Sequence, residues 1–181
     1  AEEGLRESEE RFRVLFEYAP DAYYLNDLKG ALVDANRAAE ALVGYSKEGL
    51  IGKSFLKLKL VSLNQIPRAA ALLARNVLGQ PTGPDELVLN RRDGTRVAAE
   101  IRTFPVKLQG RTLVLGIARD ITERKRLEKE SQERRLYLES VLACAPDAIV
   151  TLDDEHKVLE WNQGAEALFG YTPEEAIGRD I

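Results

Sequence analysis

The chain has 181 residues, of which 44% are hydrophobic and 31% charged, which is enough for one packed domain and part of a second. A formal net charge of −4 excludes a global positive field for nucleic acid, and one cysteine with one histidine excludes an internal disulfide and a Cys/His zinc site. No apolar run reaches the roughly 20 residues of a membrane span, and the acidic N-terminus is not a signal peptide. We therefore expect a cytoplasmic fragment of a longer protein, whose other parts could carry a membrane anchor.

Residues 2–17 carry charges throughout and predict an amphipathic helix that ends before Pro20, because the residue before a proline disfavours helical geometry. The apolar residues at helical spacing are Leu5, Phe12, Leu15 and Phe16. Two short apolar runs follow at 22–26 and 31–35, and the Lys29-Gly30 pair between them predicts a hairpin.

Helices are predicted next. Asn36 is a predicted N-cap of a short helix over residues 37–43, which ends at Gly44. A further helical turn is predicted to end at Gly52. Residues 65–78 predict a longer amphipathic helix. Its apolar face is predicted to hold Ile66, Ala69, Ala70, Leu73 and Val77.

Three strands are predicted over 86–91, 95–106 and 112–119, with turns at Arg92-Asp93-Gly94 and Leu108-Gln109-Gly110 between them. The order is thus two strands, several helices and three strands. This order predicts an α/β (α+β) fold, in which one five-stranded antiparallel sheet is covered by helices on one face.

Residues 122–143 contain no glycine or proline and predict a single helix of about 33 Å at 1.5 Å per residue. Asp120 and Glu123 fit a capping box at its start. Apolar residues are sparse along it, so a solvated connector is at least as good an interpretation as a coiled-coil linker.

Residues 12–55 align without a gap with residues 138–181, and 15 of the 44 pairs are identical. The constant offset of 126 residues has the size of a whole domain. The identical pairs include Ala19/Ala145, Pro20/Pro146, Asn36/Asn162, Gly44/Gly170 and Tyr45/Tyr171. The chain therefore holds one complete unit and the opening third of another.

Three motifs resemble those of the PAS family of sensory domains. APDA occurs at 19–22 and 145–148, an N-x-x-A-E-x-L-x-G-Y segment occurs at 36–45 and 162–171, and Asp120-Ile121-Thr122 is similar to the family's exit motif. The implied organisation is an amphipathic linker helix at 1–17, a complete PAS domain at 18–121, a helical linker at 122–143 and the N-terminal part of a second PAS domain at 144–181.

The resemblance implies a sheet in the strand order 2-1-5-4-3, helices that enclose a small cavity against one sheet face, and a helix that carries the signal onward from Asp120, Ile121 and Thr122. It also implies a tandem PAS region of a bacterial or archaeal signalling protein, such as a sensor histidine kinase of a two-component system or a diguanylate cyclase. The expected partners are adjacent PAS and output domains and a second copy, bound through the N-terminal and linker helices.

No nucleophile with a base, metal cluster or phosphate-binding loop is recognisable in the sequence, and His156 falls in a predicted turn. We therefore expect no catalytic or metal site in this chain, although the parent protein could carry a kinase or cyclase domain. Helix 65–78 has no side chain that resembles a haem ligand of the family, so haem is not expected. Cys144 is interpreted as a small buried residue. No cofactor is predicted, and non-covalent flavin stays open because it needs no single diagnostic residue.

The candidate ligand pocket draws on helix 65–78 and on alternate positions of the last three strands. The candidate lining residues are Ile66, Ala70, Leu73, Val77, Leu87, Leu89, Ala99, Ile101, Thr103, Leu115 and Ile117. They favour a small apolar ligand, and simple core packing is the competing interpretation. The leading hypothesis is a sensory and signal-relay module. The alternatives are an architectural dimerisation domain without a ligand and a flavin redox sensor.

Overall fold

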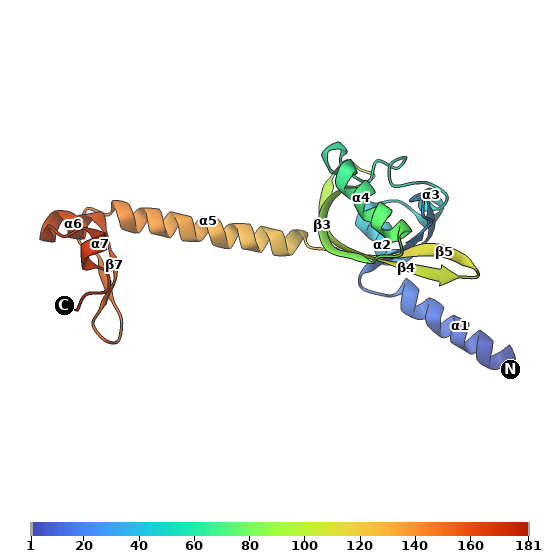
Figure 1. Ribbon diagram of the computed structural model, residues 1–181, viewed down its shortest axis with the longest axis horizontal. Helices are drawn as coiled ribbons and strands as arrows, with labels where there is room; N and C mark the ends of the chain where they lie inside the picture. Colours follow the sequence, from blue (N-terminus) through green and yellow to red (C-terminus); the bar gives the residue numbers. More distant parts are fainter. Residues whose placement is uncertain (1, 181) are drawn as a thin grey trace. The chain divides into compact units, whose positions relative to one another are not determined.

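The computed structural model describes residues 2–180, which divide into two compact units between Lys125 and Arg126 (Figure 1). The elements of the first unit are α1 (Glu2–Glu17), β1 (Ala22–Asn26), β2 (Leu32–Ala35), α2 (Arg37–Val43), α3 (Lys47–Leu50), the 3-10 helix η1 (Leu63–Gln65), α4 (Ile66–Val77), β3 (Thr82–Asn90), β4 (Arg96–Leu108) and β5 (Arg111–Asp120).

The five strands of the first unit form one antiparallel sheet in the order β2-β1-β5-β4-β3, which confirms the predicted fold class and strand order. The helices α2, α3 and α4 lie on one side of this sheet (Figure 1). The core lies between the two layers, where Leu50, Val97 and Ala99 are almost completely buried.

Strand β3 begins at Thr82, which is four residues earlier than predicted. Thr82 pairs with Thr103 and Asp85 pairs with Ile101, so the register shifts across the two residues between them. Pro84 has no N–H to offer a neighbour, and an edge strand with a bulge tolerates it. The proline therefore lies at an irregularity within the strand.

Helix α1 is bonded to the sheet through the side chain of Asn36. The Asn36 Nδ2 donates to the carbonyl oxygens of Phe16, at 2.9 Å, and Asp21, at 3.0 Å. The Oδ1 of the same amide accepts from the backbone N–H groups of Tyr23 and Ala39, both at 2.9 Å, which confirms the predicted cap of α2. One buried amide thus connects the end of α1, the start of β1 and the start of α2.

The described side chains of α1 before Phe16 are all exposed. Phe12 and Leu15 are 71% and 65% exposed, respectively. Phe16, by contrast, packs edge-on against the ring of Tyr23, with the ring centroids 6.2 Å apart. The side chain of Leu5 lies outside the described residues.

The helix α5 (Thr122–Cys144) begins in the first unit and ends in the second. The second unit also holds β6 (Val150–Leu152), β7 (Val158–Trp161), α6 (Gln163–Phe169) and α7 (Pro173–Ala176), and β6 pairs with β7. Ile181, which aligns with Phe55, lies outside the described residues.

The second unit repeats the bonding of the first. The Asn162 Nδ2 donates to the carbonyl oxygens of Leu142, at 3.1 Å, and Asp147, at 2.9 Å, while its Oδ1 accepts from Ile149 N and Ala165 N. This agreement supports the internal repeat found in the sequence. Within residues 2–180, no helix combines the length and apolar composition needed to cross a membrane.

Candidate functional site: a cavity and the start of the exit helix

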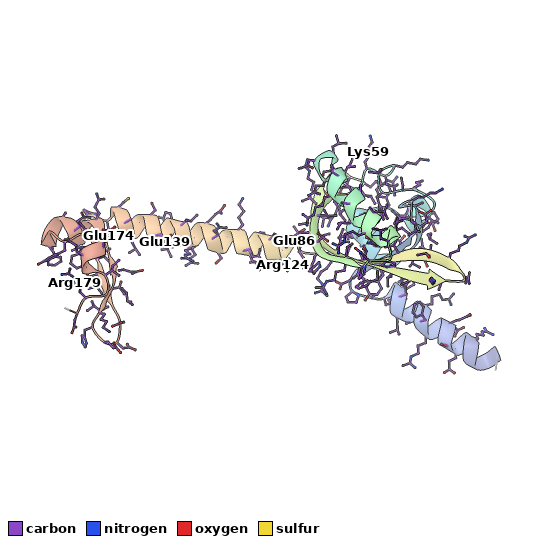
Figure 2. The ribbon with its side chains drawn as sticks, in the orientation of Figure 1. Lys59, Glu86, Arg124, Glu139, Glu174 and Arg179 are labelled. Carbon is purple, nitrogen blue, oxygen red and sulfur yellow. The ribbon has the colours of Figure 1, made fainter. Side chains whose placement is uncertain are left out.

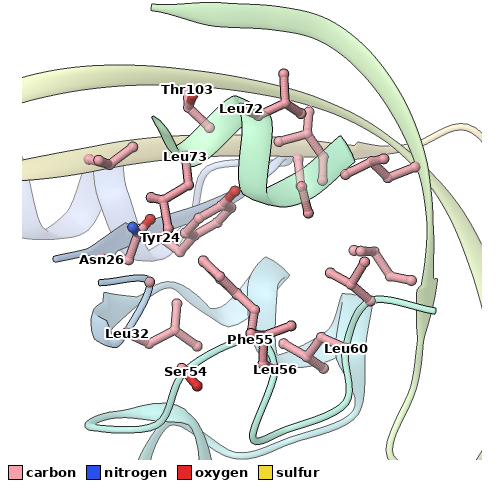
Figure 3. A pocket seen from close by; sticks show the side chains of 18 of the residues that line it. Tyr24, Asn26, Leu32, Ser54, Phe55, Leu56, Leu60, Leu72, Leu73 and Thr103 are labelled. Carbon is pink, nitrogen blue, oxygen red and sulfur yellow. The ribbon is translucent and has the colours of Figure 1, made fainter. Parts of the chain in front are cut away.

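A cavity of about 200 Å³ lies between helix α4 and the inner face of the sheet (Figure 3). Its remaining walls come from α2, α3 and the loop of residues 54–61. Most of its lining side chains are apolar. Seven of the predicted lining residues do line it: Ile66, Ala70, Leu73, Leu87, Leu89, Ile101 and Thr103.

The prediction that Leu115 and Ile117 line this cavity is wrong. The strand register places Ile101 of β4 opposite Ala118 of β5, so odd-numbered residues of β4 share a face with even-numbered residues of β5. The even-numbered Val114 and Ala118 therefore line the cavity, and the two predicted residues lie on the opposite face of the sheet.

Val77 and Ala99 do not line the cavity either. Ala99 lies on the inner face but is fully buried by its neighbours in the core, so none of its surface is left to reach the cavity. Val77 is 52% exposed because α4 is rotated relative to the predicted orientation. The α4 residues that form the least exposed stripe on the cavity side are Ala69, Leu72, Leu73 and Asn76.

Sequence reasoning missed Tyr24 and Phe55, whose rings meet edge-on at 5.7 Å in the cavity wall (Figure 3). Tyr24 lies opposite Gly116 of β5, and a Cβ atom at that glycine would lie only 2.0 Å from the Tyr24 Cζ atom. The glycine therefore leaves the room that the tyrosine ring occupies. The alternation of Ala22, Tyr24 and Asn26 along β1 could have revealed Tyr24, but no local pattern places the loop residue Phe55.

Several polar side chains belong to the wall of the cavity, among them Tyr24, Thr103 and Asn76. Burial raises the pKa of the Tyr24 phenol above its ordinary value of 10.0, so the phenol is neutral at physiological pH. The hydroxyl groups of Thr103 and Thr82 are hydrogen-bonded to each other at 2.7 Å. Asn76 is only 1% exposed, and its Oδ1 has no hydrogen-bond partner among the described residues.

The predicted relay residues lie at the N-terminal end of α5. The Asp120 Oδ1 accepts from Thr122 N at 2.8 Å, and the Thr122 Oγ1 accepts from Ala98 N at 3.3 Å. Ile121 is 3% exposed, and its N–H donates to the Ala98 carbonyl at 2.9 Å. These bonds hold the first residues of α5 against the neighbouring strand β4.

Arg91 connects the N-terminal end of α5 to helix α2, which forms part of the cavity wall. Its Nε donates to the Leu42 carbonyl at 3.0 Å, at the end of α2, and its Nη2 lies 3.4 Å from the Asp120 Oδ2. Helix α2 lines the cavity through Ala39 and Val43. Arg91 thus contacts both the end of α2 and the start of α5.

The first turn of α5 also carries two cations that meet acidic side chains of the sheet, and Figure 2 labels Arg124 and Glu86 among these residues. The Arg124 Nη2 lies 2.9 Å from the Glu86 Oε1 and 3.7 Å from the Glu100 Oε2, and the Lys125 Nζ lies 2.5 Å from the Glu86 Oε2. Glu86 and Glu100 are cross-strand partners whose like charges would repel each other without these cations. The hydrogen bond from Lys125 lowers the pKa of the Glu86 carboxyl.

Among residues 2–180 no three His, Cys, Asp or Glu side chains gather in a way that could hold a metal ion. The interpretation of Cys144 as a buried residue is wrong, because the thiol lies exposed at the end of α5. His156 lies exposed in the turn between β6 and β7, as predicted.

A five-stranded antiparallel sheet, a small cavity under its covering helices and a helix that leaves the last strand define a sensory α/β domain. A family model described as "PAS domain" matches residues 20–123, and one described as "PAS fold" matches residues 132–181. The chain belongs to the PAS family, and it consists of PAS sensory domains rather than a catalytic domain.

Several signalling proteins are similar to this chain. Sporulation kinase E of Bacillus subtilis is 26% identical over 171 residues, which are 94% of this chain and 22% of that protein. Oxygen sensor protein DosP of Escherichia coli is 26% identical over 147 residues, 79% of this chain and 18% of that protein. Sensor protein FixL of Bradyrhizobium diazoefficiens is 36% identical over 66 residues, 36% of this chain and 13% of that protein. The chain spans 22%, 18% and 13% of the length of these three relatives, respectively.

Two solved structures show the same fold. The PAS domain of an HTR-like protein from Haloarcula marismortui has a TM-score of 0.59 and 26% identity, and the match covers 66% of this chain and 97% of that one. A domain of a sensory box sensor histidine kinase/response regulator from Geobacter sulfurreducens has a TM-score of 0.54 and 30% identity, and covers 64% and 96%.

Proposed function

We propose that this chain is the sensory and signal-relay part of a multi-domain signalling protein, in which a small, largely apolar ligand in the cavity of the first unit sets the position of α5. The observation that carries the proposal is the pair of contacts made by Arg91. Its side chain bonds both to the cavity-lining helix α2 and to Asp120 at the N-terminal end of α5. The parent protein would carry a kinase or cyclase domain, as its relatives' names indicate.

The size of the cavity favours a small ligand. At about 200 Å³ it lies below the 300–1,000 Å³ typical of sites for drug-sized ligands, whereas a cavity of about 150 Å³ takes benzene. The three-ring system of a flavin is much larger than benzene. We therefore favour a small-ligand sensor over a flavin redox sensor. A colourless purified protein is the result expected if no flavin is bound.

The relay can be tested by filling the cavity. Ala69 lines the cavity, whereas Ala71 lies exposed on the same helix and does not line it. The substitution Ala69→Phe should mimic a bound ligand and change amide hydrogen exchange over residues 122–128 by about threefold or more. The matched variant Ala71→Phe, which adds the same ring outside the cavity, should leave this exchange unchanged.

The architectural alternative makes a different prediction. If the domain only spaces its neighbours, Ala69→Phe will fold, as judged by circular dichroism, and exchange at the start of α5 will match the wild type. Native mass spectrometry of freshly purified protein adds an independent observation, because a sensor that retains its ligand shows extra mass.

We further propose that α1 takes part in a homodimer. Its exposed apolar residues Phe12, Val14 and Leu15 are unusual for a helix that faces only water. Sedimentation velocity should show a concentration-dependent dimer, and Phe12→Lys with Leu15→Lys should shift it to monomer. A concentration-independent monomer in the wild type would contradict this proposal.

A further inference from the structure

We propose that Glu86 of the edge strand β3 is a positioning residue for α5, and that it connects the first turn of α5 to the covering helix α4. The inference rests on the proposed sensory function and adds a second connection beside that of Arg91. It follows from the bonds that β3 makes on its two faces.

Strand β3 is bonded to the N-terminal end of α4. The Arg68 Nη2 donates to the Asp85 Oδ1 at 2.8 Å, and the Gln65 Oε1 accepts from Val88 N at 3.0 Å. Arg68 lies in the first turn of α4, and Gln65 is the N-cap of that helix. Ile66 of the same turn lines the cavity. Strand β3 is therefore bonded to an end of α4 that reaches the cavity.

The next residue of β3 is bonded to α5. Asp85 pairs with Ile101, which lines the cavity, so Asp85 lies on the face that α4 covers. Successive side chains of a strand point to opposite faces, so Glu86 lies on the outer face. Its carboxylate lies 2.9 Å from the Arg124 Nη2 and 2.5 Å from the Lys125 Nζ, both in the first turn of α5. One strand thus bonds the covering helix on one face and the exit helix on the other.

Like charges on β3 and β4 make the docking of α5 depend on its cations. Glu86 and Glu100 are cross-strand partners, and adjacent carboxylates repel each other. The Arg124 guanidinium contacts both, with its Nη2 2.9 Å from the Glu86 Oε1 and 3.7 Å from the Glu100 Oε2. If the first turn of α5 leaves the sheet, the two carboxylates lose this shared cation. The turn therefore has two arrangements, docked on the carboxylate pair or released from it, and the position of Glu86 sets the balance between them.

These charges form a network rather than an isolated surface ion pair. An exposed pair stabilises a fold little, because solvent screens it and both side chains lose freedom. Here one carboxylate binds two cations, and the side chain of its neighbour Glu100 is only 20% exposed. The hydrogen bond from Lys125 lowers the pKa of Glu86, and the charges of Arg124 and of Arg68 on α4 add to this effect. Cations of both helices thus act on the same carboxylate.

The test measures whether Glu86 transmits a change at α4 to α5. Amide hydrogen exchange of residues 122–128 is compared in the full chain for the wild type, Ala69→Phe, Glu86→Gln and the double variant. Glu86→Gln by itself should speed this exchange about threefold, because it removes a carboxylate that binds two cations. The effect of Ala69→Phe, about threefold in the wild type, should fall to about 1.5-fold or less in the Glu86→Gln background.

A second perturbation of α4 does not depend on filling the cavity. Arg68→Gln changes an exposed side chain and removes the ion pair with Asp85. It should change the exchange of residues 122–128 about twofold in the wild type and less in the Glu86→Gln background. The matched control is Glu139→Gln, which removes a carboxylate that pairs with Arg135 farther along α5. This control should leave the exchange of residues 122–128, and its response to both changes in α4, as in the wild type.

Salt provides a further measurement, because dissolved ions screen exposed charges. The difference in exchange between the wild type and Glu86→Gln should shrink when NaCl is raised from about 0.05 M to about 1 M. A difference that stays constant would show that charge does not hold α5 at Glu86, and would overturn the inference.

An equal response of α5 to the changes in α4, with and without the Glu86 carboxylate, would also overturn the inference. Glu86 would then only stabilise the start of α5, and the response in the wild type would still support the proposed sensory function. If Ala69→Phe leaves the exchange of α5 unchanged in the wild type, the sensory function itself is contradicted. Failure of the inference and failure of the proposed function are therefore distinguishable.

Discussion

Single asparagine residues connect the helix that enters each unit to the domain that follows. Asn36 and Asn162 each donate to carbonyl groups at the end of the incoming helix and accept from the first strand and the following short helix. An amide can do this because it carries a donor group and an acceptor on one short side chain. The identical bonding in both units explains why this residue is the same in both copies of the repeat.

Replacing Asn36 with alanine should lower the free energy of unfolding by about 2 kcal/mol, because the cap of α2, the bond from Tyr23 N and two bonds to carbonyl groups are lost together. Urea denaturation followed by circular dichroism measures this change. The control is Asn64→Ala at an exposed position, which should stay within about 0.5 kcal/mol of the wild type. Equal stability of both variants would show that the four bonds of the Asn36 side chain add nothing.

The ion pair between Asp21 and Arg119 makes the free energy of unfolding depend on pH in the acid range. The Asp21 carboxylate accepts from Arg119 at 2.8 Å and 3.0 Å, and these bonds lower the pKa of Asp21 from its ordinary value of 3.8. A lowered folded-state pKa means that the unfolded chain binds the proton more readily. The contribution of this pair is therefore present above pH 3.8 and is lost as the pH falls through the folded-state pKa.

Asp21→Asn should thus lose stability relative to the wild type at neutral pH, and the difference should shrink as the pH falls below 3.8. Denaturation curves of both proteins over this range measure it. The comparison with the variant is needed because Glu86 and Asp93 also have lowered pKa values and give the wild type an acid dependence of its own. A difference that stays constant with pH would show that the pair contributes through packing rather than charge.

At the scale of elements, α5 is a helix with an unusually well-bonded start. Asp120 and Thr122 bond its first residue to its own turn and to β4, and Arg124 and Lys125 reach the acidic side chains of β3 and β4. Beyond this turn α5 is exposed along its length, with Leu127 and Leu136 more than half exposed. The attachment of the helix to the domain is therefore concentrated in its first turn.

The double variant Asp120→Ala with Thr122→Ala should loosen α5 without unfolding the domain. Amides of residues 122–128 should exchange about tenfold faster, while the circular dichroism spectrum stays native. The matched control is Asp93→Ala with Thr95→Ala, an Asp–Thr pair that bonds only within its own turn. This control should leave α5 unchanged. Global unfolding of the test variant would assign the pair a purely structural role.

At the scale of the whole molecule, the two units differ in how their first strand is held. In the first unit β1 pairs with β2 on one side and β5 on the other. In the second unit β6 pairs with β7 alone among the described residues, over three residue pairs. Leu159 and Phe169 of the second unit are both more than half exposed. A two-stranded hairpin of this kind is marginally stable in water.

In a dilute monomer, amides of residues 148–160 should therefore exchange about a hundredfold or more faster than those of residues 112–119. The repeat offers an internal control, because residues 22–26 align with 148–152 but are paired on both sides. They should exchange as slowly as β5. Similar protection in the two copies, at a concentration where the chain is monomeric, would show that the second unit is stable by itself.

Short local sequence patterns were sufficient to predict many of the turns, helix caps and hairpins of this protein. The turn at Lys29-Gly30, the cap at Asn36 and the hairpin at Arg92-Asp93-Gly94 each depend on a few adjacent residues, and all three are present in the structure. The internal repeat and its motifs led to the sheet order and the family. These features were predictable because capping, turn geometry and amphipathic periodicity act over short stretches of chain.

The tertiary structure decided the composition of the site. Which face of β5 reaches the cavity depends on its register against β4, and a shift of one residue reverses the face of every side chain. The rotation of α4 that brings Asn76 to the cavity and turns Val77 outward depends on packing against the sheet. The bond from Arg91 to Asp120 joins residues 29 positions apart. The sequence by itself determined the elements and their order, whereas these contacts required the folded chain, because they are made between elements and no local pattern encodes them.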